Sequence, residues 1–298
     1  MPILILMTLV WAFSFSLIGE YLAADVDAYI AVFIRMVLAC VLIVPFLRIG
    51  QTPTKKRLYL MGIGAIQIGL MYLLLYHAFL YISVAEVLLF TIFTPLYITL
   101  LDERVLNKKQ LPLAWWIAAL ISVIGAGLIR YQGLSVGFIT GFVLIQGANL
   151  CFALGQVAYK RLELGTPRQQ LQHYGLFFVG ATIVSGLGML LFADFNRTPT
   201  TTVHWIVLLW LGLGASGVGY LLWSIASKRV NIGQLATMNN ALIPAGLLVN
   251  FALWGQDVNW PQLILGGTII VIAVVIASRV QPNRRHGTNT SDPSKENI

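Results

Sequence analysis

The sequence predicts an all-α polytopic membrane protein with ten transmembrane helices, arranged as two inverted five-helix repeats. Composition is the first observation behind this prediction: 58% of the 298 residues are hydrophobic, 10% are charged and the mean hydropathy is +0.82. A water-soluble domain could not carry such a composition without large exposed apolar patches. The second observation is that the apolar residues fall in ten runs long enough to cross a bilayer. The third is that basic residues concentrate in alternate loops between these runs.

Each run holds roughly 20 residues, the length that a helix needs to cross the hydrocarbon core. Charges, prolines or glycine clusters separate one run from the next. The runs lack the alternation of a membrane β-barrel, so helices are the only spanning structure that remains. In chain order the runs lie near 2–22, 28–48, 58–80, 83–101, 112–130, 137–159, 172–193, 205–227, 232–254 and 261–280.

The loop charges indicate the orientation of the chain. Of the 19 Lys and Arg residues, 16 lie in one alternate set of loops and in the C-terminal tail, whereas Arg130 and Arg197 lie in the other set. Because basic loops stay in the cytoplasm, both termini are predicted to be cytoplasmic, in a bacterial cytoplasmic (inner) membrane. Anchoring loops also explain the net charge of +8, so nucleic-acid binding is an unnecessary interpretation.

The two ends of the chain are interpreted differently. The first run has no basic segment before it and is longer than the apolar core of a secretory signal, so it is predicted to be the first helix. Residues 281–298 are polar and are predicted to form a disordered cytoplasmic tail. Cys40 and Cys151 fall within runs and lack metal-type spacing, so neither a disulfide nor a metal site is predicted.

The chain also resembles itself. Because five runs per half is an odd number, the second half must enter the membrane in the opposite orientation, as in many alternating-access carriers. The predicted repeats are 1–131 and 132–280. The correspondences pair segment 72–78 with 220–226, Pro95 with Pro244 and, more weakly, Trp11-Ala12 with Phe152-Ala153.

Arg35 is the most unusual charge in the sequence because it lies inside the second run. A charge at that depth costs at least about 2.5 kcal/mol unless it is paired or hydrated, so it must face protein or water. One interpretation is a guanidinium that binds a substrate carboxylate. The other is a structural pair with Glu20, Glu86 or a carbonyl at a helix end.

His77 and Glu86 are predicted to lie at a similar depth, near the outer ends of the third and fourth runs. A carboxylate and an imidazole at one depth could relay a proton, which makes them candidates for proton coupling. The alternative is an outer-surface pair exposed to water.

Amide side chains gather in the sixth and ninth runs. Gln146 and Asn149 lie on one helical stripe, and Asn239 and Asn240 precede Pro244. Pro95 interrupts the fourth run in the same way, and such broken helices expose carbonyls near mid-membrane, where carriers commonly bind substrate. The amides are therefore candidates for substrate binding; the alternative is that they bridge neighbouring helices.

Several aromatic residues lie within runs rather than at the membrane interfaces. Trp11, Tyr72, Tyr76 and Trp223 recur at repeat-related or adjacent heights, so they are candidates for the walls of a substrate cavity. Packing alone is the alternative for most of the other aromatic residues.

Certain short segments resemble a known family. Val10-Trp11-Ala12-Phe13 in the first run, the prolines of the fourth and ninth runs, and Gly255-Gln256 resemble the EamA-like branch of the drug/metabolite transporter superfamily. The resemblance covers about residues 1–280 and implies transport of a small metabolite by a ten-helix fold. The opening segment 2–11 is similar to that of enterobacterial biotin uptake permeases in this superfamily.

The residues exclude several other classes of function. The sequence holds no G-x-x-x-x-G-K-[ST], G-x-S-x-G or H-E-x-x-H motif. We therefore expect that this chain alone does not drive transport with ATP. We also expect that it is not an enzyme and that it binds no cofactor. We expect a secondary carrier of a small organic metabolite that works by alternating access, with biotin uptake as the leading function. Export of amino acids or related amphipathic metabolites is the alternative, and a non-transporting membrane sensor is the alternative from another class.

Overall fold

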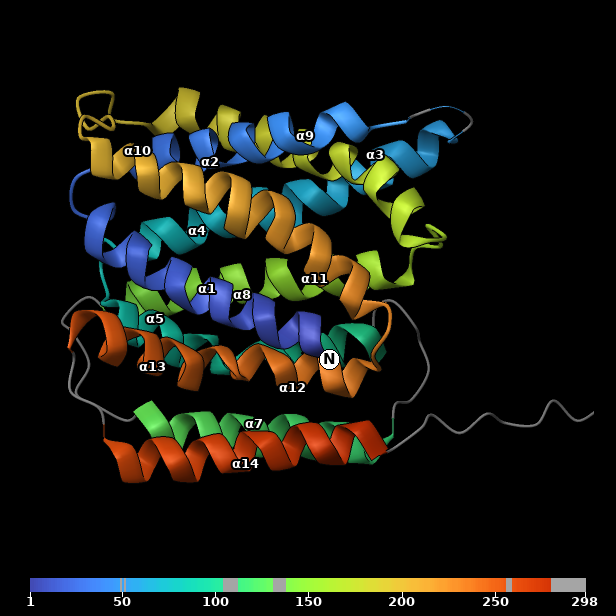
Figure 1. Cartoon of the computed structure of the whole chain (residues 1–298), viewed down its shortest axis with the longest axis vertical. Coiled ribbons are helices and arrows are strands. Elements are labelled where there is room, and N and C mark those ends of the chain that lie inside the picture. The colour runs from blue at the N-terminus through green and yellow to red at the C-terminus, as the bar shows by residue number, and fades with distance from the viewer. Residues whose placement is uncertain (49, 51, 104–111, 131–137, 256–258, 280–298) are drawn as a thin grey trace, which may run out of the picture.

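The computed structural model describes residues 1–48, 50, 52–103, 112–130, 138–255 and 259–279, and within these ranges the chain forms helices and no strand (Figure 1). Gln256 and the predicted tail at 281–298 lie outside the described residues. The N-terminal half contains α1 (Pro2–Tyr21), α2 (Ala28–Ile43) with η1 (Val44–Phe46), α3 (Thr54–Gly64), η2 (Ala65–Leu70), α4 (Met71–Ala78), α5 (Val84–Phe90), η3 (Thr91–Phe93), α6 (Thr94–Leu100) and α7 (Leu113–Arg130). The C-terminal half contains α8 (Phe138–Arg161), α9 (Pro167–Phe192), α10 (Thr202–Leu209), η5 (Trp210–Val218), α11 (Gly219–Ser227), α12 (Ile232–Asn240), α13 (Leu242–Trp254) and α14 (Trp260–Arg279).

These helices confirm the prediction of an all-α membrane protein. Eight segments of the described chain are long and apolar enough to cross a bilayer, and α7 adds a shorter apolar helix at Leu113–Gly125. The remaining predicted span, 83–101, is the broken series α5, η3 and α6. Large apolar side chains also face outward: Leu113, Ile139 and Leu190 are 66% to 72% exposed, as expected of a surface that meets lipid.

Local sequence signals explain where several helices begin. The Asp27 carboxylate accepts hydrogen bonds from the backbone N–H groups of Tyr29 and Ile30 and so caps α2. Capping boxes begin α5 at Ser83, α9 at Thr166 and α12 at Asn231. In each box a side-chain oxygen satisfies a backbone donor that the first helical turn leaves unpaired.

The helix contacts follow a two-fold pattern that relates the two halves. The α4–α8 contact corresponds to the α1–α11 contact, and the α3–α9 contact corresponds to that of α2 with η5. Helices that are equivalent in the two halves pack against each other, as α2 does with α9 and α7 with α14. Figure 1 shows α7 and α14 side by side at one edge of the bundle, with α2 and α9 at the opposite edge. This arrangement is the inverted pair of five-helix repeats that the sequence predicts.

Breaks in the helices also recur in equivalent places. In the third and eighth spans, the π-helical segments η2 and η5 interrupt the α-helix just before Tyr72 and Tyr220. In the fourth span η3 precedes Pro95, and in the ninth span a turn at Ala241 separates α12 from α13, which contains Pro244. The π-helical segments were not expected from the sequence.

Two glycines allow α3 and α9 to approach closely. A Cβ atom at Gly64 would lie 1.8 Å from the carbonyl oxygen of Phe177, and one at Gly180 would lie 1.9 Å from the carbonyl oxygen of Met61. Both contacts would be with backbone atoms, which cannot move aside as a flexible side chain could. The two helices therefore depend on glycine at both positions for their separation.

We expect Gly64→Ala and Gly180→Ala each to destabilise the protein by about 1–3 kcal/mol, because the added methyl group would force the two helices apart. Gly62→Ala is the matched control on the same helix, since a Cβ atom there meets nothing within 4 Å. Thermal unfolding in detergent measures the difference. Equal unfolding temperatures for all three variants would contradict this account of the packing.

Candidate functional site

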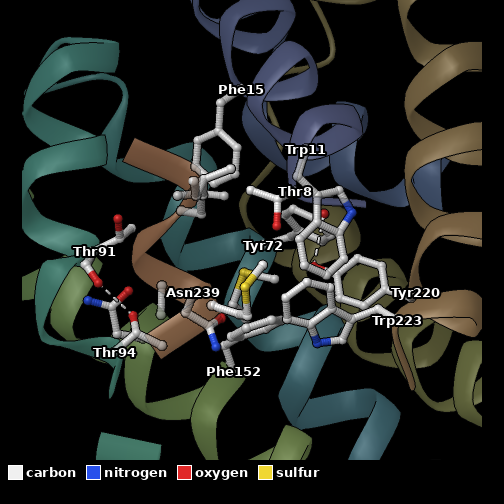
Figure 2. Close-up of a pocket in the computed structure, with 16 residues that line it drawn as sticks. Thr8, Trp11, Phe15, Tyr72, Thr91, Thr94, Phe152, Tyr220, Trp223 and Asn239 are labelled. Atoms are coloured by element: carbon white, nitrogen blue, oxygen red, sulfur yellow. Dashed lines mark hydrogen bonds between the residues drawn. The ribbon is translucent and has the colours of Figure 1, made fainter. Parts of the chain in front are cut away.

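A cavity lies in the middle of the bundle, between the two halves of the chain (Figure 2). Each half of the chain contributes eight residues to its lining, from three equivalent spans per half. The first half supplies Thr8, Trp11, Phe15, Met71, Tyr72, Leu75, Thr91 and Thr94, and the second half supplies Ala148, Asn149, Phe152, Tyr220, Trp223, Met238, Asn239 and Leu242.

The structure brings together five of the nine residues predicted to bind substrate. The residues that line this cavity are Trp11, Tyr72, Asn149, Trp223 and Asn239. The other four, which do not line it, are Arg35, Tyr76, Gln146 and Asn240.

Aromatic rings form one wall of the cavity. The ring centroid of Trp11 lies 4.6 Å from that of Trp223, 4.9 Å from that of Tyr220 and 6.0 Å from that of Phe152. Figure 2 shows these rings grouped on one side, with Thr91 and Thr94 on the other. Trp11 donates to the Ala215 carbonyl at 3.0 Å, which fixes its ring. A preformed aromatic wall suits a ligand with a flat or apolar body.

Residues that correspond in the two repeats meet in this cavity. Trp11 packs edge-on against Phe152, its counterpart in the second half. The hydroxyl groups of Tyr72 and Tyr220 are also counterparts, and they form a hydrogen bond of 3.1 Å. Phe152 and Tyr220 were not among the predicted binding residues, although their repeat relation to Trp11 and Tyr72 was a signal that could have identified them.

Arg35 lies behind the cavity wall rather than in the cavity lining. Its side chain donates to the hydroxyl groups of Ser216 at 2.6 Å, Tyr72 at 2.5 Å and Tyr76 at 3.3 Å. The guanidinium carbon also lies 3.9 Å from the centre of the Tyr72 ring, a cation–π distance. Arg35 is 1% exposed, and within the described residues all its side-chain partners are hydroxyl groups.

Glu86 and His77 have different surroundings. The Glu86 carboxylate accepts from the backbone N–H and the hydroxyl group of Ser83, at 2.8 and 2.9 Å, and so caps α5. His77 packs near the rings of Tyr29 and Tyr81, and its buried Nδ1 has no hydrogen-bond partner among the described residues. No hydrogen bond joins His77 to Glu86 in the described part of the chain, so proton coupling through them stays a prediction.

Most of the predicted amides bind backbone carbonyls at the break in the fourth span. Gln146 and Asn149 both donate to the Phe90 carbonyl, at 3.0 and 2.9 Å. Asn240 donates to the Ile92 carbonyl at 3.1 Å. These carbonyls lie where the helical hydrogen-bond pattern changes, so amides from the second half supply their donors.

Asn239 differs from Asn240. It donates to the Leu235 carbonyl at 2.7 Å and to Gln156 Oε1 at 3.4 Å, and its side chain lies at the cavity, as Figure 2 shows. Neither Asn149 nor Asn239 accepts a hydrogen bond at Oδ1 from another described residue. Both oxygens are therefore available to donors on a ligand.

A membrane bundle of two inverted repeats around one shared central pocket is the architecture of a membrane transporter. The sequence pattern of the EamA-like transporter family matches residues 1–131 and 139–279, and the chain belongs to that family.

Relatives and a solved structure agree with this membership. The chain is 44% identical to a protein of Salmonella typhimurium named "Biotin transporter", over 92% of this chain and 91% of the relative. It is 43% identical to the "Biotin transporter" of Escherichia coli K12, over 92% and 91% of the two chains. It is 43% identical to the "Probable biotin transporter" of Pseudomonas aeruginosa, over 92% and 96%. A solved crystal structure of a protein with 17% identity has the same fold, with a TM-score of 0.72 over 93% of this chain and 99% of that one.

The shared Phe90 carbonyl predicts non-additive effects on stability. Gln146→Leu and Asn149→Leu each leave one amide that donates to the carbonyl, although Gln146→Leu also removes the acceptor of the Tyr97 hydroxyl group. The double variant removes both amide donors from the carbonyl, so we expect a further loss of about 1 kcal/mol beyond the sum of the single variants. Thermal unfolding of the four proteins in detergent measures this coupling. Additive losses would mean that the amides do not share the task of satisfying this carbonyl.

Proposed function

We propose that this protein is a secondary transporter that takes up biotin across the bacterial cytoplasmic (inner) membrane, with both chain ends in the cytoplasm. Similarity to proteins named biotin transporters over 92% of the chain is the observation that carries the proposal. The excess of basic residues in alternate loops supports the orientation.

The chemistry of the pocket suits biotin. The molecule has a fused bicyclic body with a ureido group and an aliphatic chain that ends in a carboxylate. The rings of Trp11 and Trp223 offer a flat wall for the bicyclic body. The Oδ1 atoms of Asn149 and Asn239 can accept from the ureido N–H groups.

Alternating access is the proposed mechanism, with one five-helix half moving against the other. Equal contributions of the halves to one central cavity support it, because such motion would change access from each side in turn. An ion pair joins the halves at the proposed cytoplasmic end: the Asp102 carboxylate, 1% exposed, accepts from Arg161 Nε at 2.8 Å and also from Nη2. This pair would have to separate when the pocket opens to the cytoplasm.

Two lysines connect the ends of α8 and α11 at the same end of the second half. Lys160, at the end of α8, donates to the carbonyl of Ser227, the last residue of α11, and to that of Val230, both at 2.5 Å. Lys228, after α11, donates to carbonyls at the end of α8, including that of Tyr159 at 2.9 Å. Burial, with the nearby charge of Lys56, lowers the pKa of Lys228 to about 8. Each lysine thus satisfies terminal carbonyls of the other helix.

Uptake in a biotin auxotroph tests the proposed substrate. Expression of the chain should restore growth at low external biotin. Trp11→Ala and Trp223→Ala should reduce radiolabelled biotin uptake about tenfold or more, because each removes a large wall of the pocket. Trp205→Ala is the matched control, since this tryptophan is 45% exposed and does not line the cavity. No growth rescue despite membrane expression would remove biotin as the substrate.

The Asp102–Arg161 pair provides a test of the mechanism. We expect Asp102→Asn to favour the state that is open to the cytoplasm, because it weakens a contact that holds the halves together. With Cys40 and Cys151 replaced by serine, a cysteine placed at Ala148 in the cavity should react several-fold faster with an impermeant thiol reagent in inside-out vesicles. Arg168→Gln, at an exposed position, is the control for surface charge. Unchanged labelling from both sides would argue against a role for this pair in access.

A further inference from the structure

We infer that the Tyr72 hydroxyl, positioned by Arg35 and Tyr220, is the contact for a ligand carboxylate, so that the pocket selects solutes carrying one. The inference rests on the proposed function and divides its pocket into an anion-binding end and a neutral end. Three observations carry it: a buried charge with no acidic partner among the described residues, a surplus hydroxyl hydrogen, and the internal use of the other hydroxyl donors of the pocket.

The first observation is the electrostatic state of Arg35. A fully buried guanidinium inside a membrane span is costly unless an anion or several dipoles compensate it. Here the side-chain partners among the described residues are three neutral hydroxyl groups, from Ser216, Tyr72 and Tyr76. Negative charge is therefore the missing component. Tyr72 is the one of these three partners that lines the cavity, so an anion in the cavity can reach the positive charge only through Tyr72.

The second observation is the hydrogen-bond pattern at Tyr72. A tyrosine hydroxyl has one hydrogen to donate and two lone pairs that can accept. The Tyr72 oxygen accepts from Arg35 at 2.5 Å and from Tyr220 at 3.1 Å, so its own hydrogen has no acceptor among the described residues. If Tyr72 instead donates to Tyr220, the Tyr220 hydrogen is left over. Either direction leaves one O–H donor in a pair that lines the cavity.

The third observation is that the other hydroxyl groups of the cavity already donate to the protein backbone. Thr8 donates to the Leu4 carbonyl, Thr91 to that of Leu88 and Thr94 to that of Thr91, all at 2.7–2.8 Å. The one other unpaired donor of the described lining is the neutral Trp223 Nε1. The Tyr72–Tyr220 pair is thus where an available donor and a buried positive charge coincide.

These observations assign different roles to the residues. Tyr72 touches the ligand and donates to a carboxylate oxygen. Arg35 is a positioning residue, because it lies 3.9 Å behind the Tyr72 ring and makes the hydroxyl a stronger donor by bonding to its oxygen. Tyr220 occupies the second lone pair and restricts the direction in which the Tyr72 hydrogen can point.

The test compares the affinities of the purified full-length protein for biotin and biotin methyl ester, which differ in the charge of the carboxyl group. Wild type should bind the acid about 10- to 100-fold more tightly, as expected for one charge-assisted hydrogen bond. Tyr72→Phe should remove this preference and leave ester binding unchanged. Arg35→Gln should do the same, with partial recovery in Arg35→Lys. Tyr76→Phe is the matched control: Tyr76 is on the same helix and also bonds to Arg35, but it does not line the cavity.

The outcomes separate this inference from the proposed function. Equal binding of acid and ester by wild type overturns the carboxylate site and leaves biotin as the substrate. Equal weakening of acid and ester by Tyr72→Phe also overturns it, because Tyr72 would then be only a wall. If Tyr72→Phe does not fold, Tyr220→Phe decides, since it must weaken acid binding several-fold and spare the ester.

A protein that binds neither biotin nor its ester would remove biotin as the substrate. In that case the affinities of wild type and Tyr72→Phe for phenylalanine and its methyl ester test the carboxylate site. Preference for the amino acid that is lost in Tyr72→Phe would keep the carboxylate site. Lack of preference would overturn both proposals.

Discussion

Backbone carbonyls inside a membrane need donors from the protein itself, and this constraint organises the centre of the molecule. The fourth span changes from α-helix to a tighter turn at Thr91–Phe93, where the Phe90 and Ile92 carbonyls accept hydrogen bonds from donors of other helices. Amides of α8 and α12 supply these donors, so helices of the second half are held at the break in the first. The same amide side chain of Asn149 that donates to Phe90 also presents its oxygen to the cavity. A structural role and the proposed binding role would therefore coincide in one residue.

Hydropathy predicted the number and order of the spans because these depend on local composition. The repeat correspondences predicted which segments are equivalent, and the prolines at 95 and 244 indicated where the fourth and ninth spans change direction. The π-helical segments could not be predicted, because hydropathy and repeat correspondences do not distinguish a π-helical turn from an α-helical one.

The partners of Arg35, near the candidate site, also could not be predicted from the sequence. The sequence placed the charge inside a span and left two interpretations open: binding of a substrate carboxylate, or a structural pair with an acidic residue or with a carbonyl at a helix end. Its observed partners come from α4 and η5, and their approach depends on the rotation of three helices about their axes. No local pattern records that rotation. The pairing of Asp102 with Arg161 was missed for the same reason, since each residue alone resembles an ordinary loop charge.

The pocket combines symmetric geometry with asymmetric chemistry. Equivalent spans of both halves line it, yet the buried cation belongs to α2 of the first half, and the free amide oxygens belong to α8 and α12 of the second. Through the proposed contacts, a solute with a carboxylate at one end and N–H donors at the other would be bound by both halves at once. Binding would then favour arrangements in which the halves lie close together around the solute. A solute with only one of these groups would leave one half without its contact, and the same asymmetry would make the pocket selective.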